Sequence, residues 1–272
     1  MAFRTGIWNV NSVKARLPHL LDWLKRDMPE IVLLQETKCT DDAFPAMELE
    51  ELGYNLALHG EKSYNGVAIL SKFPLEDVRR GLPGEDQFGH ARYIEAVANL
   101  PGRAVRVASV YVPNGQNLDS DKFPYKLHFL ERLGAHLLAL LAYEEMLIVG
   151  GDYNVAPYPA DVYDPARLDG NVCYHPEERA RIRAILHLGF YDGFRLINPP
   201  PEGTHGGGEY TFWDYRAASF EANRGWRIDY PLLSPQAADA LRDCVIVKTL
   251  RGLDKPSDHA PLLASFADAR EG

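Results

Sequence analysis

The sequence has few cysteines, no long apolar segment and fewer basic than acidic residues. Its three cysteines, Cys39, Cys173 and Cys244, are odd in number and far apart, which is typical neither of a disulfide framework nor of a zinc cluster. We predict that all three are structural and that the protein works in a reducing compartment. No apolar stretch approaches the roughly 20 residues of a membrane helix, and the first residues lack the features of a signal peptide. We therefore expect a soluble, cytoplasmic protein.

The formal net charge of −9 argues against strong nonspecific binding to nucleic acid. Such binding normally depends on lysine and arginine side chains that neutralise phosphates. Net charge is an average, however, and a local basic rim still binds a polyanion when the acids gather in a metal site or on another face. The composition therefore leaves open a metal-dependent enzyme that acts at one defined site.

The chain contains neither a low-complexity linker nor a visible repeat, so we expect one domain over residues 1–272. Several predicted strands follow one another without a helix between them, which favours two packed sheets with helices outside over a parallel Rossmann sheet. A glycine-rich dinucleotide loop is also missing after the first strand. We predict strands over 4–10, 30–36, 66–74, 92–100, 105–113, 146–154, 226–234 and 261–267, and helices over 13–27, capped by Ser12, and 125–143.

Polar side chains follow the apolar part of many of these strands. Because catalytic groups concentrate on loops held by a rigid sheet, we expect these strand ends to converge on one site. Gly150 and Gly151 would let the backbone of another element approach closely there. The polar residues concerned are Asn9, Asn11, Gln35, Glu36, Tyr111, Asn114, Asp152, Asn154, Asp258 and His259, together with Asp229, which is expected to end the strand in GWRID.

Each of these residues also has an ordinary structural explanation. Asn9 could cap a turn, and Tyr111 could belong to the core. Glu36 is harder to explain in this way, because a carboxylate buried after an apolar strand needs a partner, and a divalent metal ion is one such partner. The aromatic residues between positions 210 and 230 could equally form part of the core.

Eight motifs that span nearly the whole chain carry a family resemblance. In order, they are WNVNSVKAR, LLQETK, GVAILSK, VYVPNG, GDYNVAP, TFWDYR, NRGWRID and KPSDHAP. Together they resemble the exonuclease III family of abasic-site endonucleases, within the endonuclease/exonuclease/phosphatase superfamily. LLQETK and SDHAP alone would indicate only the superfamily, whereas NRGWRID and TFWDYR narrow the resemblance to the DNA-repair branch.

The resemblance implies a fold and an activity. The fold is an α/β four-layered sandwich of the DNase I type, in which two packed mixed sheets are flanked by helices. The activity is Mg²⁺-dependent cleavage of double-stranded DNA 5′ to abasic sites, with Mn²⁺ able to substitute, accompanied by 3′ phosphodiesterase and 3′ to 5′ exonuclease activities. The expected partner is DNA with abasic sites or blocked 3′ ends, bound by a monomer without a membrane.

The resemblance also implies roles for individual residues. Asp152 corresponds to the general acid/base, His259 to the imidazole that faces the scissile phosphate, and Asp229 to the hydrogen-bond partner of that imidazole. Tyr111 and Asn114 correspond to phosphate contacts, and Asn154 to the amide that holds the attacking water or the phosphate. The implied metal site draws on Asn9, Glu36, Asp152, Asn154, Asp258 and His259.

The same resemblance predicts a substrate pocket in the segment EYTFWDYRAASFEANRGWRIDY. Phe212, Trp226 and Ile228 would accept a flipped deoxyribose without a base, and extrusion is easiest where there is no base to unstack. Arg216, Asn223, Arg224 and Arg227 would contact DNA phosphates or wedge into the duplex. The chain departs from the family at Ser12, Val13 and Lys14 and in a glycine-rich loop in THGGGEYTFW. These departures concern loop contacts and binding of the duplex rather than the chemistry.

Two other readings compete with this one. A superfamily phosphodiesterase could act on another ester, such as a phosphoinositide, sphingomyelin or undamaged DNA, but it would lack the tryptophan motif NRGWRID. A catalytically inactive DNA-binding relative would have lost at least one of Glu36, Asp152, Asn154 or His259, and all four are present. The sequence leaves open which group deprotonates the water and whether one or two metal ions act.

Overall fold

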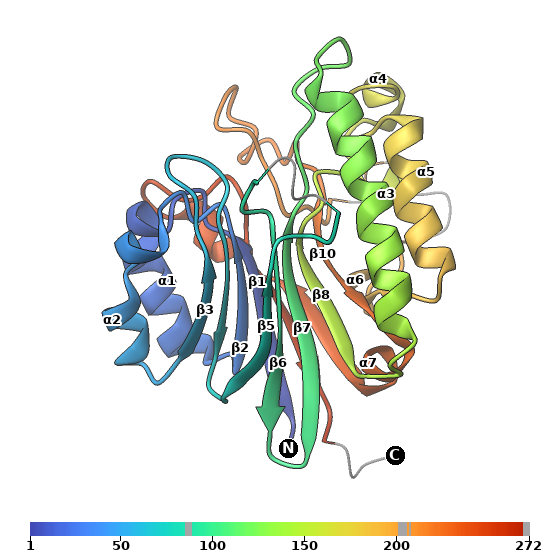
Figure 1. The fold of residues 1–272 in the computed structure, drawn as a ribbon. Helices are drawn as coiled ribbons and strands as arrows, with labels where there is room; N and C mark the ends of the chain where they lie inside the picture. The colour runs from blue at the N-terminus through green and yellow to red at the C-terminus, as the bar shows by residue number, and fades with distance from the viewer. Residues whose placement is uncertain (85–88, 201–205, 207, 269–272) are drawn as a thin grey trace.

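Two six-stranded sheets pack face to face in the centre of the molecule (Figure 1). A computed structural model describes residues 1–84, 89–200, 206 and 208–268. The first sheet has the order β11 (Leu241–Ile246), β12 (Leu262–Phe266), β1 (Phe3–Asn9), β2 (Ile31–Gln35), β4 (Val67–Ser71) and β3 (Asn55–His59). The second has the order β5 (Leu75–Arg80), β6 (Tyr93–Leu100), β7 (Arg103–Tyr111), β8 (Leu147–Asp152), β10 (Asp229–Leu233) and β9 (Tyr191–Asp192).

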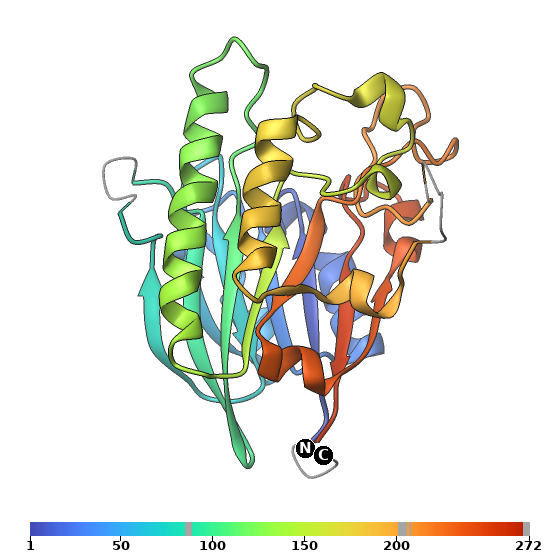
Figure 2. The same ribbon diagram turned by 90° about the vertical axis from the view of Figure 1, so that its right-hand side faces the viewer.

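Helices cover the outer face of each sheet (Figures 1 and 2). The α-helices are α1 (Val13–Asp27), α2 (Ala46–Glu50), α3 (Lys122–Leu141), α4 (Pro165–Leu168), α5 (Pro176–His187), α6 (Gly193–Ile197) and α7 (Pro235–Ala240), with short 3₁₀ helices at Asp41–Ala43, Pro159–Asp161 and Lys248–Gly252. α1 and α2 lie on the first sheet, and α3 and α5 on the second. This arrangement confirms the predicted four-layered α/β sandwich. Within the described residues, every helix is too short or too polar to cross a lipid bilayer.

Each sheet is mixed, and its parallel pairs bring strand ends to the same edge. β1 runs parallel to β2, with Asn9 opposite Gln35, and β7 runs parallel to β8, with Tyr111 opposite Asp152. β12 runs antiparallel to β1 and pairs Leu262 with Ile7, so the residues just before β12 lie beyond the end of β1. The segments that follow β1, β2, β7 and β8 therefore share one end of the sandwich with the segment that precedes β12.

β2 is buried on both faces, which explains why its residues 31–34 are all apolar. Ile31 and Leu33 belong to the core between the two sheets, whereas Val32 and Leu34 pack on the other face together with Trp23 of α1. Successive side chains of a strand point to opposite faces, so a strand that is covered on both faces needs apolar residues at every position. The cap of α1 is also as predicted, because the Ser12 hydroxyl accepts a hydrogen bond from the Ala15 backbone N–H at 3.4 Å.

The two sheets approach closely at the end of β8. A Cβ atom at Gly150 would lie 2.6 Å from Ile7 Cδ1 of the opposite sheet, and one at Gly151 would overlap the Val110 carbonyl. The close approach predicted for these two glycines is thus confirmed. The two glycines let the backbone of β8 pass close to β1 and β7 and place Asp152 at the end of the sandwich.

The prediction that Asp229 ends a strand is wrong, because Asp229 begins β10. Trp226, which was expected to lie in this strand, makes only isolated bridges with Val162 and Phe212. β10 runs antiparallel to β8 and pairs Asp229 with Asp152. The start of an antiparallel strand lies beside the end of its partner, so Asp229 reaches the same edge as the other predicted residues.

Candidate active site

The predicted residues gather at that edge around one cavity of about 680 Å³. The cavity draws side chains from both sheets and from the loop before β12. The predicted residues that do not line it are Asn9, Asn11, Gln35, Asn223, Arg224, Arg227 and Asp229. Those that do are Glu36, Tyr111, Asn114, Asp152, Asn154, Phe212, Arg216, Trp226, Ile228, Asp258 and His259.

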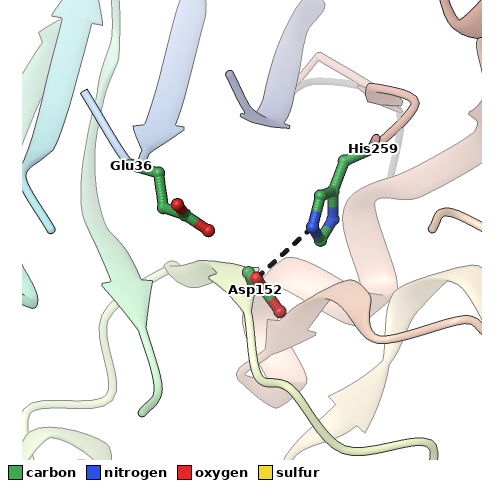
Figure 3. A group of neighbouring side chains, drawn as sticks. All are labelled: Glu36, Asp152 and His259. Carbon is green, nitrogen blue, oxygen red and sulfur yellow. Dashed lines mark ion pairs between the residues drawn. The ribbon is translucent and has the colours of Figure 1, made fainter. Parts of the chain in front are cut away.

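Two carboxylates and one imidazole form the polar centre of the cavity (Figure 3). Glu36, Asp152 and His259 each offer a ligand atom, and these atoms lie within 4.8 Å of one another. Asn9 joins the two carboxylates, since its Nδ2 donates to Glu36 Oε1 at 2.8 Å and to Asp152 Oδ2 at 2.9 Å. The Asn9 amide therefore holds the carboxylates close together despite their mutual repulsion.

The backbone at Glu36 is strained in a way that aims its carboxylate. Glu36 and Lys38 have φ values of 52° and 54°, in the left-handed region that costs other residues about 1–2 kcal/mol compared with glycine. Bonds from the Thr37 N–H to the Gly66 carbonyl and from the Lys38 N–H to the Asn65 carbonyl hold this turn. Strain of this kind persists where the surroundings determine the conformation, which is common at functional sites.

Asp152 is the most tightly held carboxylate of the site. It is 1% exposed, and its Oδ1 accepts from the Asn154 backbone N–H at 2.8 Å. Burial raises its pKa well above the usual range, and the charges of Asp229 and Glu36 add to this shift while that of His259 opposes it. Negative charge around Asp152 is thus only partly balanced by nearby positive charge. The carboxylate oxygens of Glu36 and Asp152 therefore fit a hard divalent cation such as Mg²⁺.

His259 is a buried imidazole between two carboxylates. Its Nδ1 lies 2.8 Å from Asp229 Oδ2, and its Nε2 lies 3.7 Å from Asp152 Oδ2. Burial alone would lower the pKa of His259, but the charges of Asp229 and Asp152 outweigh it and raise the pKa to about 10. The Trp8 indole N–H fixes the backbone by donating to the His259 carbonyl at 3.0 Å. At neutral pH, His259 is therefore a charged hydrogen-bond donor, which competes with its predicted role as a metal ligand.

Tyr111, Asn114 and Asn154 line the cavity beside the carboxylates. Asn114 Nδ2 donates to Asn154 Oδ1 at 2.9 Å, and Asn154 Nδ2 donates to the Val112 carbonyl at 3.0 Å. Burial and the charge of Glu36 raise the pKa of Tyr111 well above its ordinary value. The phenol therefore stays protonated and can donate a hydrogen bond to an anion in the cavity.

An apolar wall closes the other side of the cavity. Phe212, Trp226 and Ile228 form it, and the Phe212 ring lies 5.0 Å from the His259 ring between centroids. Arg216 stands at the rim with its side chain 89% exposed, paired with Asp214 at 3.1 Å. The glycine-rich loop predicted just before this wall lies partly outside the described residues, at positions 204, 205 and 207.

The prediction that Arg227 contacts DNA is wrong. Its side chain is 0% exposed, with Nε 2.7 Å from Asp161 Oδ1 and Nη2 2.8 Å from Asp192 Oδ2. Trp226 and Ile228 face the cavity, so the residue between them points to the opposite side and into this buried ion cluster. DNA contacts of Asn223 and Arg224 stay predictions, because both residues lie outside the cavity lining.

Lys38 lies beside the site and was not predicted, although it belongs to the motif LLQETK. Lys38 Nζ lies 2.8 Å from Glu36 Oε2 and donates to Asn11 Oδ1 at 2.5 Å. Asn11 Nδ2 in turn donates to Asp258 Oδ1 at 2.9 Å. Asp258 thus connects to Glu36 through these two side chains and lies outside the Glu36, Asp152 and His259 group, so its metal role stays a prediction.

The three cysteines are free, and one of them lies at the site. Cys39 and Cys244 are buried, as expected for structural cysteines. Cys173 lines the cavity, where Asn114 Nδ2 approaches its Sγ at 3.7 Å. Burial raises the pKa of the Cys173 thiol to about 12, so it remains protonated.

Comparison with known proteins supports a single family. The model of the Endonuclease/Exonuclease/phosphatase family matches residues 6–259. Exodeoxyribonuclease III of Haemophilus influenzae is 34% identical over 267 residues, which cover 95% of this chain and 98% of that protein. The DNA repair nuclease APEX1 of Danio rerio is 32% identical over 265 residues, which cover 96% of this chain and 81% of that protein.

Solved structures agree with these relatives. The 3′ phosphatase NExo from Neisseria, bound to a product DNA hairpin, has a TM-score of 0.92 and 37% identity, covering 98% of this chain and 100% of that chain. An AP endonuclease from Archaeoglobus fulgidus has a TM-score of 0.89 and 39% identity, covering 97% and 99% respectively. The chain therefore belongs to the endonuclease/exonuclease/phosphatase family and, within it, to the exonuclease III group of DNA repair nucleases.

Proposed function

We propose that the protein hydrolyses the phosphodiester 5′ to abasic sites in double-stranded DNA, with Mg²⁺ as cofactor and Mn²⁺ as a substitute. The same site would remove blocking groups from 3′ ends and degrade DNA from 3′ to 5′. One observation carries the proposal: a single cavity joins an acidic, metal-compatible centre to an apolar wall. The acidic centre suits a divalent cation that would bind a phosphodiester. The apolar wall suits a deoxyribose that has lost its base.

Glu36 and Asp152 are the residues best placed to hold the cation. Asn9 orients both carboxylates, and Asn154, Asp258 and His259 are further candidates within the same cavity or beside it. A bound Mg²⁺ would offset the negative charge on the phosphoryl oxygens and on the departing 3′ oxygen. Mg²⁺ typically takes only one or two carboxylates and keeps several waters, which agrees with a site built around Glu36 and Asp152.

Protein groups would supply the remaining needs of an in-line displacement. Asp152, whose pKa burial raises, could exchange a proton with the attacking water or the leaving oxygen. Asn154 would orient the water or the phosphate through its amide. His259, charged beside Asp229, would donate its Nε2–H to a phosphate oxygen, an interaction that strengthens as charge develops.

Tyr111, the last residue of β7, and Asn114, which follows that strand, would also bind the phosphate. The Tyr111 phenol is protonated, and Asn114 is exposed to the cavity while its amide bonds to Asn154. These donors, together with His259, would surround the phosphate with hydrogen bonds that are in place before the reaction. Preorganised donors of this kind lower the barrier because they need little rearrangement in the transition state.

On the substrate side, Phe212, Trp226 and Ile228 would contact the flipped deoxyribose, and exposed Arg216 would contact a flanking phosphate. We further propose that the protein acts as a monomer, as one domain over residues 1–272, and that it works on DNA in the cytoplasm. The bacterial relatives named exodeoxyribonuclease III and exodeoxyribonuclease support this location.

A second candidate is an enzyme that acts mainly on 3′ ends. The likeness to a structure named as a 3′ phosphatase favours it, and it would use the same phosphate site. The difference would lie in whether the apolar wall accepts a deoxyribose within a continuous strand. An inactive relative is disfavoured, because Glu36, Asp152 and His259 lie together in the cavity.

Two duplexes separate these candidates. One carries an internal tetrahydrofuran abasic analogue and a 5′ label, and the other carries a 3′ phosphate; each is incubated with protein and Mg²⁺ or EDTA. We expect a Mg²⁺-dependent nick 5′ to the analogue and release of the 3′ phosphate. The variant His259→Ala should lose both activities, whereas His187→Ala, at an exposed position on α5, should retain them. An intact abasic duplex with an unblocked 3′ end would support the second candidate.

A further inference from the structure

A fully buried ammonium lies behind the candidate active site. Lys126 of α3 is 0% exposed, and its Nζ donates to the Asn154 carbonyl at 2.7 Å and to the Asn114 carbonyl at 3.0 Å. Its third partner is Glu178 Oε1 at 2.5 Å. An ammonium has three N–H bonds, and here each has an oxygen acceptor. Lysine is rarely buried so completely unless it is paired, so this position needs an explanation.

Glu178 connects the ammonium to a third segment of the cavity wall. It lies on α5, beside α3 in both views (Figures 1 and 2), and is also 0% exposed. Its Oε2 accepts from the His175 backbone N–H at 2.9 Å, and its Oε1 accepts from that of Cys173 at 3.2 Å. The Lys126–Glu178 pair thus ties two outer helices to the loops that carry Asn114, Asn154 and Cys173.

The two carbonyls belong to residues whose side chains enter the cavity. Asn114 follows β7 and Asn154 follows β8, where the regular pairing of the strands has ended. Asn154 has a φ of 50°, and the side chains of the two asparagines bond to each other at 2.9 Å. The backbone of each residue is therefore fixed from behind by Lys126, while its amide faces the candidate phosphate site.

Filling space between the helices and the loops does not by itself account for this ion pair. Taking two charges out of water costs several kcal/mol per ion, and apolar residues of similar volume often serve a fold equally well or better. Two apolar side chains would fill the same space but would leave the Asn114 and Asn154 carbonyls without their bonds to the ammonium. The polar pair therefore provides something that apolar packing cannot, which is a common anchor for two loops.

We propose that Lys126, held by Glu178, is a positioning residue for the nuclease reaction, because it sets the spacing between Asn114 and Asn154. This inference rests on the proposed function, in which these amides hold the phosphate and the water. A misplacement of about 1 Å can lower a rate about 10²-fold. Lys126 does not line the cavity, so it would act through the two asparagines whose carbonyls it holds.

The test separates positioning from stability. Lys126→Met keeps the length of the side chain but removes all three donors, and it leaves Glu178 with a buried, unpaired charge. The double variant Lys126→Met/Glu178→Gln removes that charge while Gln can still accept a backbone hydrogen bond. Arg106→Met is the control, since Arg106 of β7 has a side chain that is only 7% exposed and pairs with Glu145 at 2.6 Å. It lies five residues from Tyr111, about 16 Å along the strand.

We expect Lys126→Met to lower the melting temperature and to lower single-turnover cleavage of the abasic-analogue duplex about 10- to 100-fold. Its affinity for that duplex should stay within about threefold, because the effect falls on positioning rather than on binding. The double variant should regain melting temperature but not rate, and Arg106→Met should lose stability but keep its rate. If Lys126→Met fails to fold, the double variant alone carries the comparison.

A mutant cycle with Asn114→Ala adds a second readout. If Lys126 acts through Asn114 and Asn154, combining Lys126→Met with Asn114→Ala should lower the rate much less than the product of the two single effects. Strictly multiplicative effects, or a rate that recovers together with melting temperature in the double variant, would overturn the inference. A wild-type protein that fails to cleave the duplex would instead overturn the proposed function, and the inference with it.

Discussion

Replacing Asp229 by asparagine tests whether the reaction needs a charged His259. Asp229 Oδ2 lies 2.8 Å from His259 Nδ1, and both side chains are buried. Burial alone lowers the pKa of His259, whereas the charges of Asp229 and Asp152 raise it to about 10, with Asp229 contributing more. Asparagine has nearly the same shape and can still accept the hydrogen bond, but it removes the larger of the two charges.

The expected magnitude follows from the charged fraction of the imidazole. With a pKa of about 10, nearly every His259 side chain is charged at pH 7.5. With the ordinary pKa of about 6.5, only about one-tenth would be charged at that pH. If only the imidazolium stabilises the phosphate in the transition state, the variant loses at least about tenfold in rate. Burial without Asp229 would lower the pKa further, so the loss should exceed this value.

The pH dependence gives the sign of the effect. A raised pKa means that wild-type His259 is charged below about pH 10, so its contribution should be constant from pH 6 to 9. In Asp229→Asn the charged form returns only as the pH falls. The rate of the variant relative to wild type should therefore rise about five- to tenfold between pH 7.5 and 6.5.

Single-turnover cleavage of the abasic-analogue duplex at saturating Mg²⁺, measured from pH 6 to 9, provides the assay. Asp169→Asn, at a side chain that is 60% exposed, is the matched control and should follow the wild type. A rate ratio between Asp229→Asn and wild type that stays constant across this range would contradict a role for the charged form of His259. So would a rate of Asp229→Asn at pH 7.5 within about twofold of wild type.

Three further substitutions test other parts of the account. Glu36→Gln should weaken Mn²⁺ or Mg²⁺ binding at least about tenfold, because loss of a group at a metal site typically costs about 10–100-fold in affinity. Calorimetry measures this affinity, and an unchanged value would contradict the metal role of Glu36. Trp226→Ala should weaken binding to the abasic-analogue duplex by about 1–2 kcal/mol while sparing undamaged DNA, and an equal loss on both would place Trp226 outside the pocket. Arg227→Met leaves buried Asp161 with Arg195 alone and removes the arginine paired with Asp192, so it should lower the free energy of unfolding in urea by about 3–5 kcal/mol. A change below about 1 kcal/mol would show that the ion cluster is dispensable.

The layered fold and the gathering of polar strand ends could be predicted from local patterns, whereas the apolar wall of the cavity was predicted only from the family resemblance. The apolar run before Glu36 indicates a strand covered on both faces, and polar residues at the ends of parallel strands meet at one edge. β5 was missed because it is an edge strand with mostly charged, exposed residues, LEDVRR, which resembles a loop. Its pairing with β6 is visible only in three dimensions.

Side-chain direction and long-range partners set the limit of the prediction. Arg227 lies between two pocket residues, and only the structure shows that it points away from them to Asp161. Lys126 lies near the start of the amphipathic helix predicted over 125–143, and a lysine in such a helix is ordinarily exposed. Its partner Glu178 is far away in the sequence. Neither burial nor pairing of such residues can be read from local spacing.

The most direct test of the central claim maps the cleavage product of the wild type and of Asp152→Asn side by side. Both proteins are titrated with Mg²⁺ on a 5′-labelled duplex that carries one tetrahydrofuran analogue, and binding to the same duplex is measured in EDTA. We expect one internal Mg²⁺-dependent nick, directly 5′ to the analogue, for the wild type. For Asp152→Asn we expect a rate lower by at least about 10²-fold with DNA affinity retained. A nick in EDTA, an internal nick at another position, or undiminished cleavage by Asp152→Asn would contradict this expectation, whereas gradual shortening from the 3′ end would not.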